Sequence, residues 1–271
     1  MGNRVAGKVA LVTGAARGQG RAHAMRLAEE GADIIAVDVC APLPSVAYEP
    51  ATPQDLAETV TQVEKLDRRI VSGIADTRDL GALKAIVDDG VAHLGRLDIV
   101  VANAGICVIK PWDQQTPQML DDVISTNVTG TWNTIMAGAP HLVEAGGGSV
   151  IVISSAAGLK VQPFMVPYTT SKFAVRGMAK AFAAELGKHG IRVNSVHSTG
   201  VRTLMGSGSM QQEIGAAIAD YNRLAPMFMN LMPVDITEPE DVADTVLFLA
   251  SDESKFMTAH ELAPDAGVTE F

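Results

Sequence analysis

The hydrophobic residues of this chain fall into short runs, and longer stretches with helical spacing lie between them. The runs are rich in Val and Ile and are continuous rather than alternating, which is typical of strands buried on both faces. They cover residues 9–12, 34–37, 70–74, 97–101, 150–153 and 191–196. The helical stretches cover residues 21–30, 54–66, 80–94, 117–144 and 167–188. This alternation predicts an α/β fold with a doubly wound parallel sheet and right-handed crossovers.

Two segments interrupt this alternation. Residues 41–53 contain four prolines and follow the second predicted strand, so a long loop is expected there. Residues 199–236 contain five methionines, whose flexible side chains adapt to apolar ligands; these are Met205, Met210, Met227, Met229 and Met232. We expect this segment to form a lid over a substrate site, with a loosely packed pair of surface helices as the alternative. No linker or repeat divides the chain, and residues 1–271 are predicted to form a single domain.

Composition and charge narrow the class of protein. The 271 residues are 47% hydrophobic and 19% charged, as in a globular domain with a large core. The formal net charge of −10 makes nucleic acid and anionic membranes unfavourable partners. No stretch approaches the roughly 20 apolar residues of a membrane helix, and no signal peptide is expected, which predicts a cytoplasmic protein. Cys40 and Cys107 are expected to be reduced thiols, and no Cys/His spacing predicts a metal site.

A glycine-rich turn directly follows the first predicted strand. Residues 13–20 read Thr-Gly-Ala-Ala-Arg-Gly-Gln-Gly and lead into a helix expected to begin at Arg21. Gly14 would permit the tight turn, Gly18 the approach of the backbone to a pyrophosphate, and Gly20 close packing of helix on strand. The helix N-terminus would present its N–H groups and partial positive charge to the phosphates. The sequence therefore predicts a Rossmann-like dinucleotide site.

Asp38, at the end of the second predicted strand, bears on which dinucleotide binds. A carboxylate there can accept hydrogen bonds from the adenosine ribose hydroxyls and would repel a 2′-phosphate, which favours NAD over NADP. Arg17 favours the opposite choice, because a cation beside the ribose can pair with a 2′-phosphate. We expect the carboxylate to dominate and predict NAD as the cofactor.

Candidate catalytic residues follow the fourth and fifth predicted strands. Tyr168 and Lys172 are four positions apart on a predicted helix and share a face, where the ammonium would lower the tyrosine pKa from about 10. Such a tyrosine can act as acid or base near neutral pH. Ser155 and the sequence Asn103-Ala104-Gly105 end two strands at the sheet edge where ligands bind. His197 ends another strand there and is expected to satisfy local backbone groups.

In this order the motifs resemble the short-chain dehydrogenase/reductase family, from Lys8 to about Gly267. The resemblance implies an alcohol dehydrogenase or ketone reductase with a catalytic tetrad. In it, Tyr168 exchanges the alcohol proton and Ser155 hydrogen-bonds the substrate oxygen. Lys172 binds the nicotinamide ribose and lowers the tyrosine pKa, and Asn127 holds a water in the proton relay.

The expected cofactor contacts extend beyond the tetrad. By resemblance, Asp76 meets the adenine ring with Thr77 beside it, and Thr203 holds the nicotinamide carboxamide. The full expected set is Gly14, Arg17, Gly18, Gln19, Gly20, Asp38, Asp76, Thr77, Asn103, Ala104, Gly105, Tyr168, Lys172, Val201 and Thr203.

A narrower resemblance is to the mycofactocin-coupled short-chain dehydrogenases, which include carveol dehydrogenase-like proteins. It rests on the run GAARGQGRAHAMRLAEEGADIIAVDVCAPL, the loop 41–53 and the phrase VNSVHSTGVRT. It implies apolar secondary alcohols, including terpenoids, as substrates, and mycofactocin, a peptide-derived redox carrier, as electron acceptor. It also implies NAD that stays bound, and we expect the long loop to cover the adenosine end and slow NAD release. The wider family implies a homotetramer built from the two long helices and the C-terminal strand.

Two positions depart from the family pattern. Ser198 replaces the usual proline beside the nicotinamide pocket, which predicts a less rigid loop there. Ala259 replaces the usual glycine near the C-terminus, which predicts an altered C-terminal strand and subunit contact.

Two further functions stay open: an NADP-linked carbonyl reductase, because of Arg17, and a non-catalytic NAD-binding module, which the fold alone permits.

Overall fold

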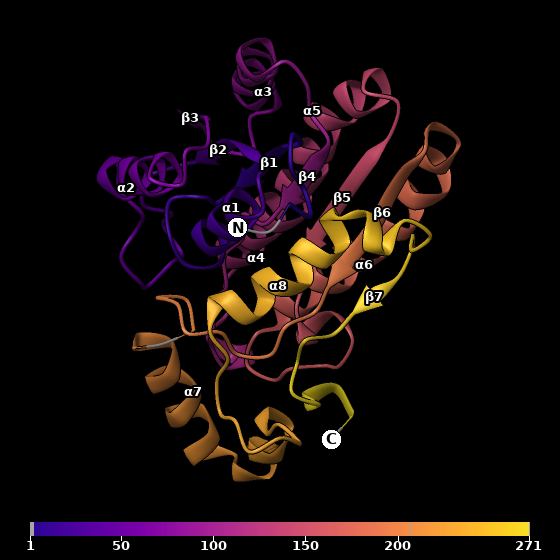
Figure 1. Cartoon of the computed structure of the whole chain (residues 1–271). Helices are drawn as coiled ribbons and strands as arrows, with labels where there is room; N and C mark the ends of the chain where they lie inside the picture. The colour runs from indigo at the N-terminus through magenta and orange to yellow at the C-terminus, as the bar shows by residue number, and fades with distance from the viewer. Residues whose placement is uncertain (1–2, 207, 271) are drawn as a thin grey trace.

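The computed structural model describes residues 3–206 and 208–270, and these contain one parallel sheet (Figure 1). The strand order is β3-β2-β1-β4-β5-β6-β7, so the connections reverse direction between β1 and β4. Ligands of such sheets bind in the crevice at this reversal. The strands are β1 (Val9–Thr13), β2 (Asp33–Asp38), β3 (Ile70–Ile74), β4 (Ile99–Ala102), β5 (Gly148–Ile153), β6 (Ile191–Val196) and β7 (Glu261–Leu262). The predicted doubly wound parallel sheet is confirmed.

Helices cover both faces of the sheet. Helices α1, α2 and α8 pack on one face and α3, α5 and α6 on the other. The helices are α1 (Gly18–Glu29), α2 (Pro53–Glu64), α3 (Leu80–Leu94), α4 (Pro117–Ile124), α5 (Gly130–Glu144), α6 (Val166–Leu186), α7 (Ser209–Asp220) and α8 (Pro239–Ala250). Within the described ranges, none of them has an apolar stretch long enough to cross a bilayer.

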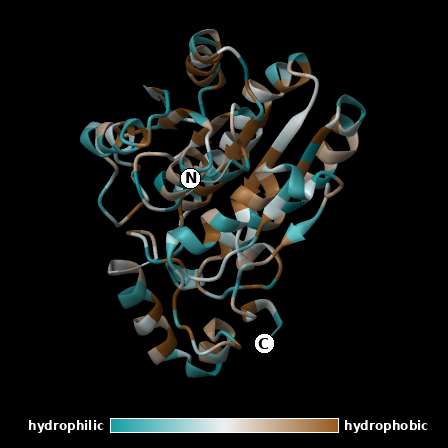
Figure 2. Cartoon of the chain, in the orientation of Figure 1, coloured by the Kyte–Doolittle hydropathy of each residue, from teal (hydrophilic) through white to brown (hydrophobic). Residues whose placement is uncertain are grey.

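Alternate residues of each strand enter two separate cores, as the period of two requires. In β1, Ala10 and Val12 pack with α1 and α8, whereas Val9 and Leu11 pack with α3, α5 and α6. Figure 2 shows hydrophobic residues concentrated on the central strands, with hydrophilic residues on the outer faces of the helices. Burial on both faces explains why the strands appear in the sequence as continuous apolar runs.

Several predicted boundaries need correction. Helix α1 begins at Gly18 rather than Arg21, so the last glycines of the turn already belong to its first turn. The predicted helix 117–144 contains a π-helical segment, Ser125–Thr129, between α4 and α5. The hydrophobic pattern also fails to predict α8 and the two-residue β7, although the family resemblance implied a C-terminal strand. The sequence does signal the start of α8, with a Glu238–Asp241 capping box and a proline in the first turn.

The predicted lid, residues 199–236, folds into α7 and the 3-10 helix Asn222–Phe228. Figure 1 shows α7 set apart from the sheet, beyond one end of the body. Met205 and Met210 line the large cavity beneath this segment, but among the described residues the other three methionines lie outside the cavity lining. The expectation of a methionine-lined pocket is therefore correct for two of the five residues.

Candidate active site

A cavity of about 990 Å³ opens at the carboxyl ends of β1, β4, β5 and β6. Its walls come from the glycine-rich turn, from residues 39–52 (the β2 loop) and from the lid. All of the residues expected to bind cofactor line it, as do Ser155 and Tyr168. Asn127 is the one tetrad residue outside the cavity lining within the described ranges.

The glycine-rich turn has no room for side chains where the phosphates are expected. Gly14 and Gly18 have positive φ angles of 67° and 55°, which favour glycine. A Cβ atom on Gly20 would lie 1.9 Å from the Gly14 carbonyl oxygen. The turn can therefore bring its backbone directly against a ligand, and this tight fold requires glycine at all three positions.

The N-terminus of α1 has no side-chain cap, in contrast to those of α2, α3 and α4. Helices α2, α3 and α4 are each capped by a side chain, from Thr52, Asp79 and Thr116 respectively. Among the described residues, no side chain caps α1, whose N-cap is Arg17. The Gln19 amide oxygen is also buried without a hydrogen-bond partner within the described part of the chain. Free N–H groups at a helix N-terminus fit the pyrophosphate of a dinucleotide, as the sequence predicts for this turn.

The two residues that favour opposite cofactors have different surroundings. Asp38 lines the cavity and accepts hydrogen bonds from the Ala16 and Cys40 amides, each at 3.0 Å. The Arg17 guanidinium donates to the carbonyl of Pro50 at 2.9 Å and also to that of Glu49. Because these carbonyls hold Arg17 on the β2 loop, the carboxylate dominates the ribose end of the cavity. This environment fits NAD.

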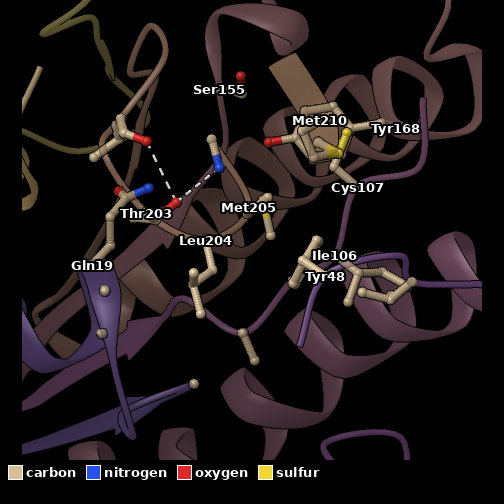
Figure 3. A pocket seen from close by; sticks show the side chains of 18 of the residues that line it. Gln19, Tyr48, Ile106, Cys107, Ser155, Tyr168, Thr203, Leu204, Met205 and Met210 are labelled. Atoms are coloured by element: carbon tan, nitrogen blue, oxygen red, sulfur yellow. Dashed lines mark hydrogen bonds between the residues drawn. The ribbon is translucent and has the colours of Figure 1, made fainter. Parts of the chain in front are cut away.

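Other expected cofactor residues mainly organise the backbone around the cavity. The Asn103 amide donates to the Thr13 carbonyl at 2.9 Å and so ties β4 to the turn. Asp76 pairs with Arg78 at 2.5 Å. Burial raises the pKa of Asp76, but the hydrogen bonds from Arg78 lower it by more, so the pKa is below its usual value. Thr203 accepts a hydrogen bond from the Gly206 amide at 3.1 Å, which closes a turn of the lid (Figure 3).

Tyr168, Lys172 and Ser155 converge on one side of the cavity. Tyr168 lies in the first turn of α6, and the Lys172 Nζ atom one turn later is 5.4 Å from its ring centroid. The Lys172 ammonium also donates to the Ile153 carbonyl at the end of β5, at 2.9 Å. The Ser155 hydroxyl accepts from the Ala157 amide at 3.1 Å and lines the same cavity as Tyr168.

Burial opposes charge on both members of the tyrosine–lysine pair. Burial raises the pKa of Tyr168, and Ser155 only partly lowers it again, so the net decrease expected from Lys172 is not found. Burial also lowers the pKa of Lys172 to about 8. At pH 7, Lys172 is therefore still mostly protonated, and its positive charge can favour ionisation of Tyr168.

Asn127 lies in the π-helical segment and contacts residues next to the cavity without lining it, among the residues that the structure describes. Its side-chain oxygen accepts from the Ile106 amide at 2.8 Å, and its nitrogen donates to the Ile106 carbonyl and the Ser171 hydroxyl, each at 2.9 Å. Ser171 in turn donates to the Tyr168 carbonyl at 2.7 Å. A Cβ atom on Gly105 would lie 3.3 Å from the Asn127 oxygen and 3.7 Å from Lys172 Nζ, so glycine there keeps these groups close.

The buried His197 contacts the backbone of Ser155. Its Nδ1 atom lies 2.9 Å from the Ser155 carbonyl, and its Nε2 atom 2.8 Å from the Ser195 hydroxyl. Burial lowers the pKa of His197, so the ring is neutral at pH 7. Since a carbonyl only accepts, Nδ1 carries the proton and Ser195 donates to Nε2. As expected, His197 hydrogen-bonds a backbone group.

The two departures from the family pattern have local compensation. Ser198 is buried, and its carbonyl accepts from the Ala156 amide at 2.8 Å. The following loop is tied to the far end of the lid through the Val201–Thr237 bridge. Ala259 has a φ of 60°, which strains a residue with a Cβ atom, yet β7 still pairs with β6 directly after it. The strand that Ala259 was expected to alter thus remains in place.

Two pocket residues, Tyr48 and Cys107, have no counterpart in the sequence prediction. Cys107 is a free, fully buried thiol, and burial raises its pKa to about 12. Tyr48 enters the cavity from the β2 loop (Figure 3). Neither belongs to a motif, because the loop that carries Tyr48 has no periodicity that would place it. Within the described ranges, no cluster of His, Cys, Asp and Glu is arranged to bind a metal ion.

Comparison with known proteins gives matches along the chain. The family model "short chain dehydrogenase" matches residues 8–214. A crystal structure of a short chain dehydrogenase from Mycobacterium paratuberculosis bound to NAD is 58% identical, with a TM-score of 0.97, and covers 99% of this chain and 100% of that one. Carveol dehydrogenase from Mycobacterium avium in complex with NAD is 46% identical, with a TM-score of 0.94 and the same coverage. The (-)-trans-carveol dehydrogenase of Rhodococcus erythropolis is 40% identical over 98% of this chain and 99% of its own length.

Proposed function

Because this chain belongs to the short-chain dehydrogenase/reductase family and is an NAD-dependent oxidoreductase, we propose that it transfers hydride between nicotinamide and apolar secondary alcohols or ketones. The observation that carries the proposal is the convergence of Tyr168, Lys172 and Ser155 at one cavity wall. An intact set of acid/base groups beside the cofactor turn argues against a non-catalytic NAD-binding module.

The roles follow from the contacts of each side chain. NAD supplies the hydride acceptor when it is bound. Tyr168 takes the alcohol proton at its phenolic oxygen in oxidation and returns it in reduction. The Ser155 oxygen accepts from the Ala157 amide, and the Ser155 O–H group donates to the substrate oxygen when substrate is bound. Lys172, cationic below its pKa of about 8, favours the Tyr168 phenolate.

Asn127 has a different role in this proposal. Its amide fixes Ile106 and Ser171, and through them the start of α6, so we assign it as a positioning residue. The expected water in a proton relay stays a prediction for this residue.

The substrate class follows from the walls around the tyrosine. Apolar side chains cluster there, with Ile109, Met165 and Met210 buried and Met205 and Phe228 packed against them. Such a surface favours an apolar ring over a polar or charged substrate. The similarity to carveol dehydrogenases supports terpenoid-like alcohols.

We also propose that NAD stays bound between turnovers and that mycofactocin is the electron acceptor. The β2 loop supports the first part, because Arg17 fastens its far end to the glycine-rich turn and Ser45 donates to the buried Asp122 in α4. Arg17→Met should therefore speed NAD dissociation at least tenfold. Arg26→Met, which removes the ion pairs of Arg26 in α1 with Glu29, Glu30 and Asp244, should leave dissociation unchanged. Equal dissociation rates from both variants would contradict this role of the loop.

A turnover count tests the catalytic proposal. The purified protein is given apolar secondary alcohols and excess NAD while reduced-nicotinamide absorbance is followed. One reduced cofactor per subunit, with further turnover only after an artificial electron acceptor is added, is the expected result. Many turnovers without an acceptor would mean exchangeable NAD, and turnover retained in Tyr168→Phe would refute the acid/base assignment. The same assay with NADP tests the NADP-linked carbonyl reductase, which we consider the weaker candidate because Arg17 is engaged by the loop.

A homotetramer completes the proposal. Helices α5 and α6 expose large apolar side chains to solvent, with Trp132, Met136 and Phe173 each about two-fifths exposed. Exposed apolar groups on adjacent long helices favour association of subunits. Light scattering on the purified protein should give four times the chain mass.

A further inference from the structure

The β2 loop is fixed at three points along its length. At its start, Asp38 accepts from the Cys40 amide, and Cys40 has a positive φ of 45°. In its middle, Ser45 bonds Asp122 of α4, and at its end Arg17 holds the carbonyls of Glu49 and Pro50. Residues between these points, Tyr48 among them, are therefore held in place rather than free to leave the cavity.

Tyr48 lies between the last two of these points and reaches the catalytic end of the cavity. Its ring packs against the apolar cluster of Cys107, Ile109, Met165 and Met210, against which the Tyr168 ring also packs. Figure 3 shows Tyr48 pointing into the same pocket as Tyr168 and the lid residues Met205 and Met210. The β2 loop thus contributes to the substrate end of the cavity as well as to the cofactor end.

The Tyr48 side chain is largely buried, which favours its neutral form. It lies beside the backbone amide of Cys107, which favours its ionised form, but burial outweighs this and raises the pKa of Tyr48. Burial raises the pKa of Tyr168 as well, but Lys172 lies over the ring of Tyr168, so we assign the acid/base role to Tyr168 and not to Tyr48. What Tyr48 supplies is a rigid aromatic surface, since a tyrosine ring has few rotatable bonds.

We propose that Tyr48 is a specificity-determining residue that forms a fixed wall of the substrate pocket and limits the size of the alcohol ring that binds beside Tyr168. This inference rests on the proposed function, whose pocket it bounds. It places substrate selection on a loop that also borders the cofactor and packs in the same cluster as the lid residues Met205 and Met210. Methionine side chains can adapt their shape, whereas the anchored tyrosine ring cannot, so the ring sets the size limit.

The test compares binding of a small and a large apolar alcohol to the NAD-loaded protein. Dissociation constants of cyclohexanol and of the bicyclic alcohol borneol are measured by calorimetric titration, and their ratio gives the size preference. Tyr48→Ala should shift the ratio toward borneol by about tenfold, and Tyr48→Trp should shift it toward cyclohexanol, because small changes in an apolar pocket alter binding by about this factor. Tyr48→Phe should keep the wild-type ratio within twofold.

Tyr221→Ala serves as the matched control, since it removes a half-exposed tyrosine ring that does not line the cavity and should keep the wild-type ratio. Opposite shifts in the Tyr48→Ala and Tyr48→Trp variants cannot come from general damage to the fold. The proposal is overturned if both variants stay within twofold of the wild-type ratio or shift in the same direction. If the ratios shift as expected but no alcohol is oxidised, the role of Tyr48 in size selection is supported and the proposed alcohol dehydrogenase activity is refuted.

Discussion

Replacement of Lys172 by Met removes the cation beside the catalytic tyrosine and should move the pH profile of alcohol oxidation. Oxidation needs the Tyr168 phenolate as a base, and burial already raises the pKa of that tyrosine. In the wild-type protein Lys172 is protonated below about pH 8, where its charge favours the phenolate. Without the cation, the rise of activity with pH should begin at a higher pH.

The size of this shift follows from the geometry. The Lys172 Nζ atom is 5.4 Å from the Tyr168 ring centroid. At an effective dielectric constant of about 20, a unit charge at this distance contributes about 3 kcal/mol, or about 2 pKa units. The kcat/KM for oxidation at pH 7 should therefore fall about 100-fold. The deficit should narrow above pH 8, where the wild-type lysine loses its own charge.

The assay is the pH dependence of kcat/KM for one alcohol, with bound NAD measured in each sample because Lys172 also lines the cofactor cavity. A double-mutant cycle with Tyr168→Phe separates the electrostatic role from damage to the site. In the Phe background, loss of Lys172 should have little further effect. A midpoint that moves by less than half a pH unit, or full additivity of the two variants, would refute the reasoning.

Three further changes have defined outcomes. Gly20→Ala should weaken NAD binding at least tenfold, because its Cβ would lie 1.9 Å from the Gly14 oxygen; Gly215→Ala, in open space on α7, should leave calorimetric NAD affinity unchanged. Asp38→Ala removes the carboxylate that repels a 2′-phosphate and should reduce the ratio of NAD to NADP affinity at least tenfold; an unchanged ratio would contradict that role. Ala259→Gly relieves a positive φ of 60° and should raise the free energy of unfolding in urea by about 0.5–1 kcal/mol, with no gain expected if the strain is absent.

The sheet was readable from the sequence because its strands are buried on both faces. Continuous Val and Ile runs leave little ambiguity when helical stretches separate them, and β1 to β6 appear where those runs lie. Strand β7 could not be found in this way, since its two residues are half-buried and carry no run. Helix α8 did have a readable signal, in its first-turn proline and capping box.

Site residues could be predicted from the sequence where a motif fixes the backbone, but not where tertiary packing determines which side chains enter the cavity. Gly20 could be assigned from its position after a strand, because the turn itself forbids a side chain. Tyr48 could not, since its entry into the pocket depends on distant anchors such as Arg17 and Asp122. The inward and outward faces of the lid were unreadable for the same reason, which is why only two of its methionines line the cavity.

The π-helical segment Ser125–Thr129 makes the length of this region as important as its composition. Each residue of an α-helix turns the chain by about 100°, so removal of one residue here would restore α-helical bonding and rotate α4 relative to α5 by about that angle. The face of α5 that packs on the sheet, including Ile135, would then no longer share an alignment with Asn127 and Ser171. Substitutions in this segment can be absorbed one at a time, whereas a single-codon deletion should disable the protein, and a deletion scan across residues 117–144 should find its most damaging positions there.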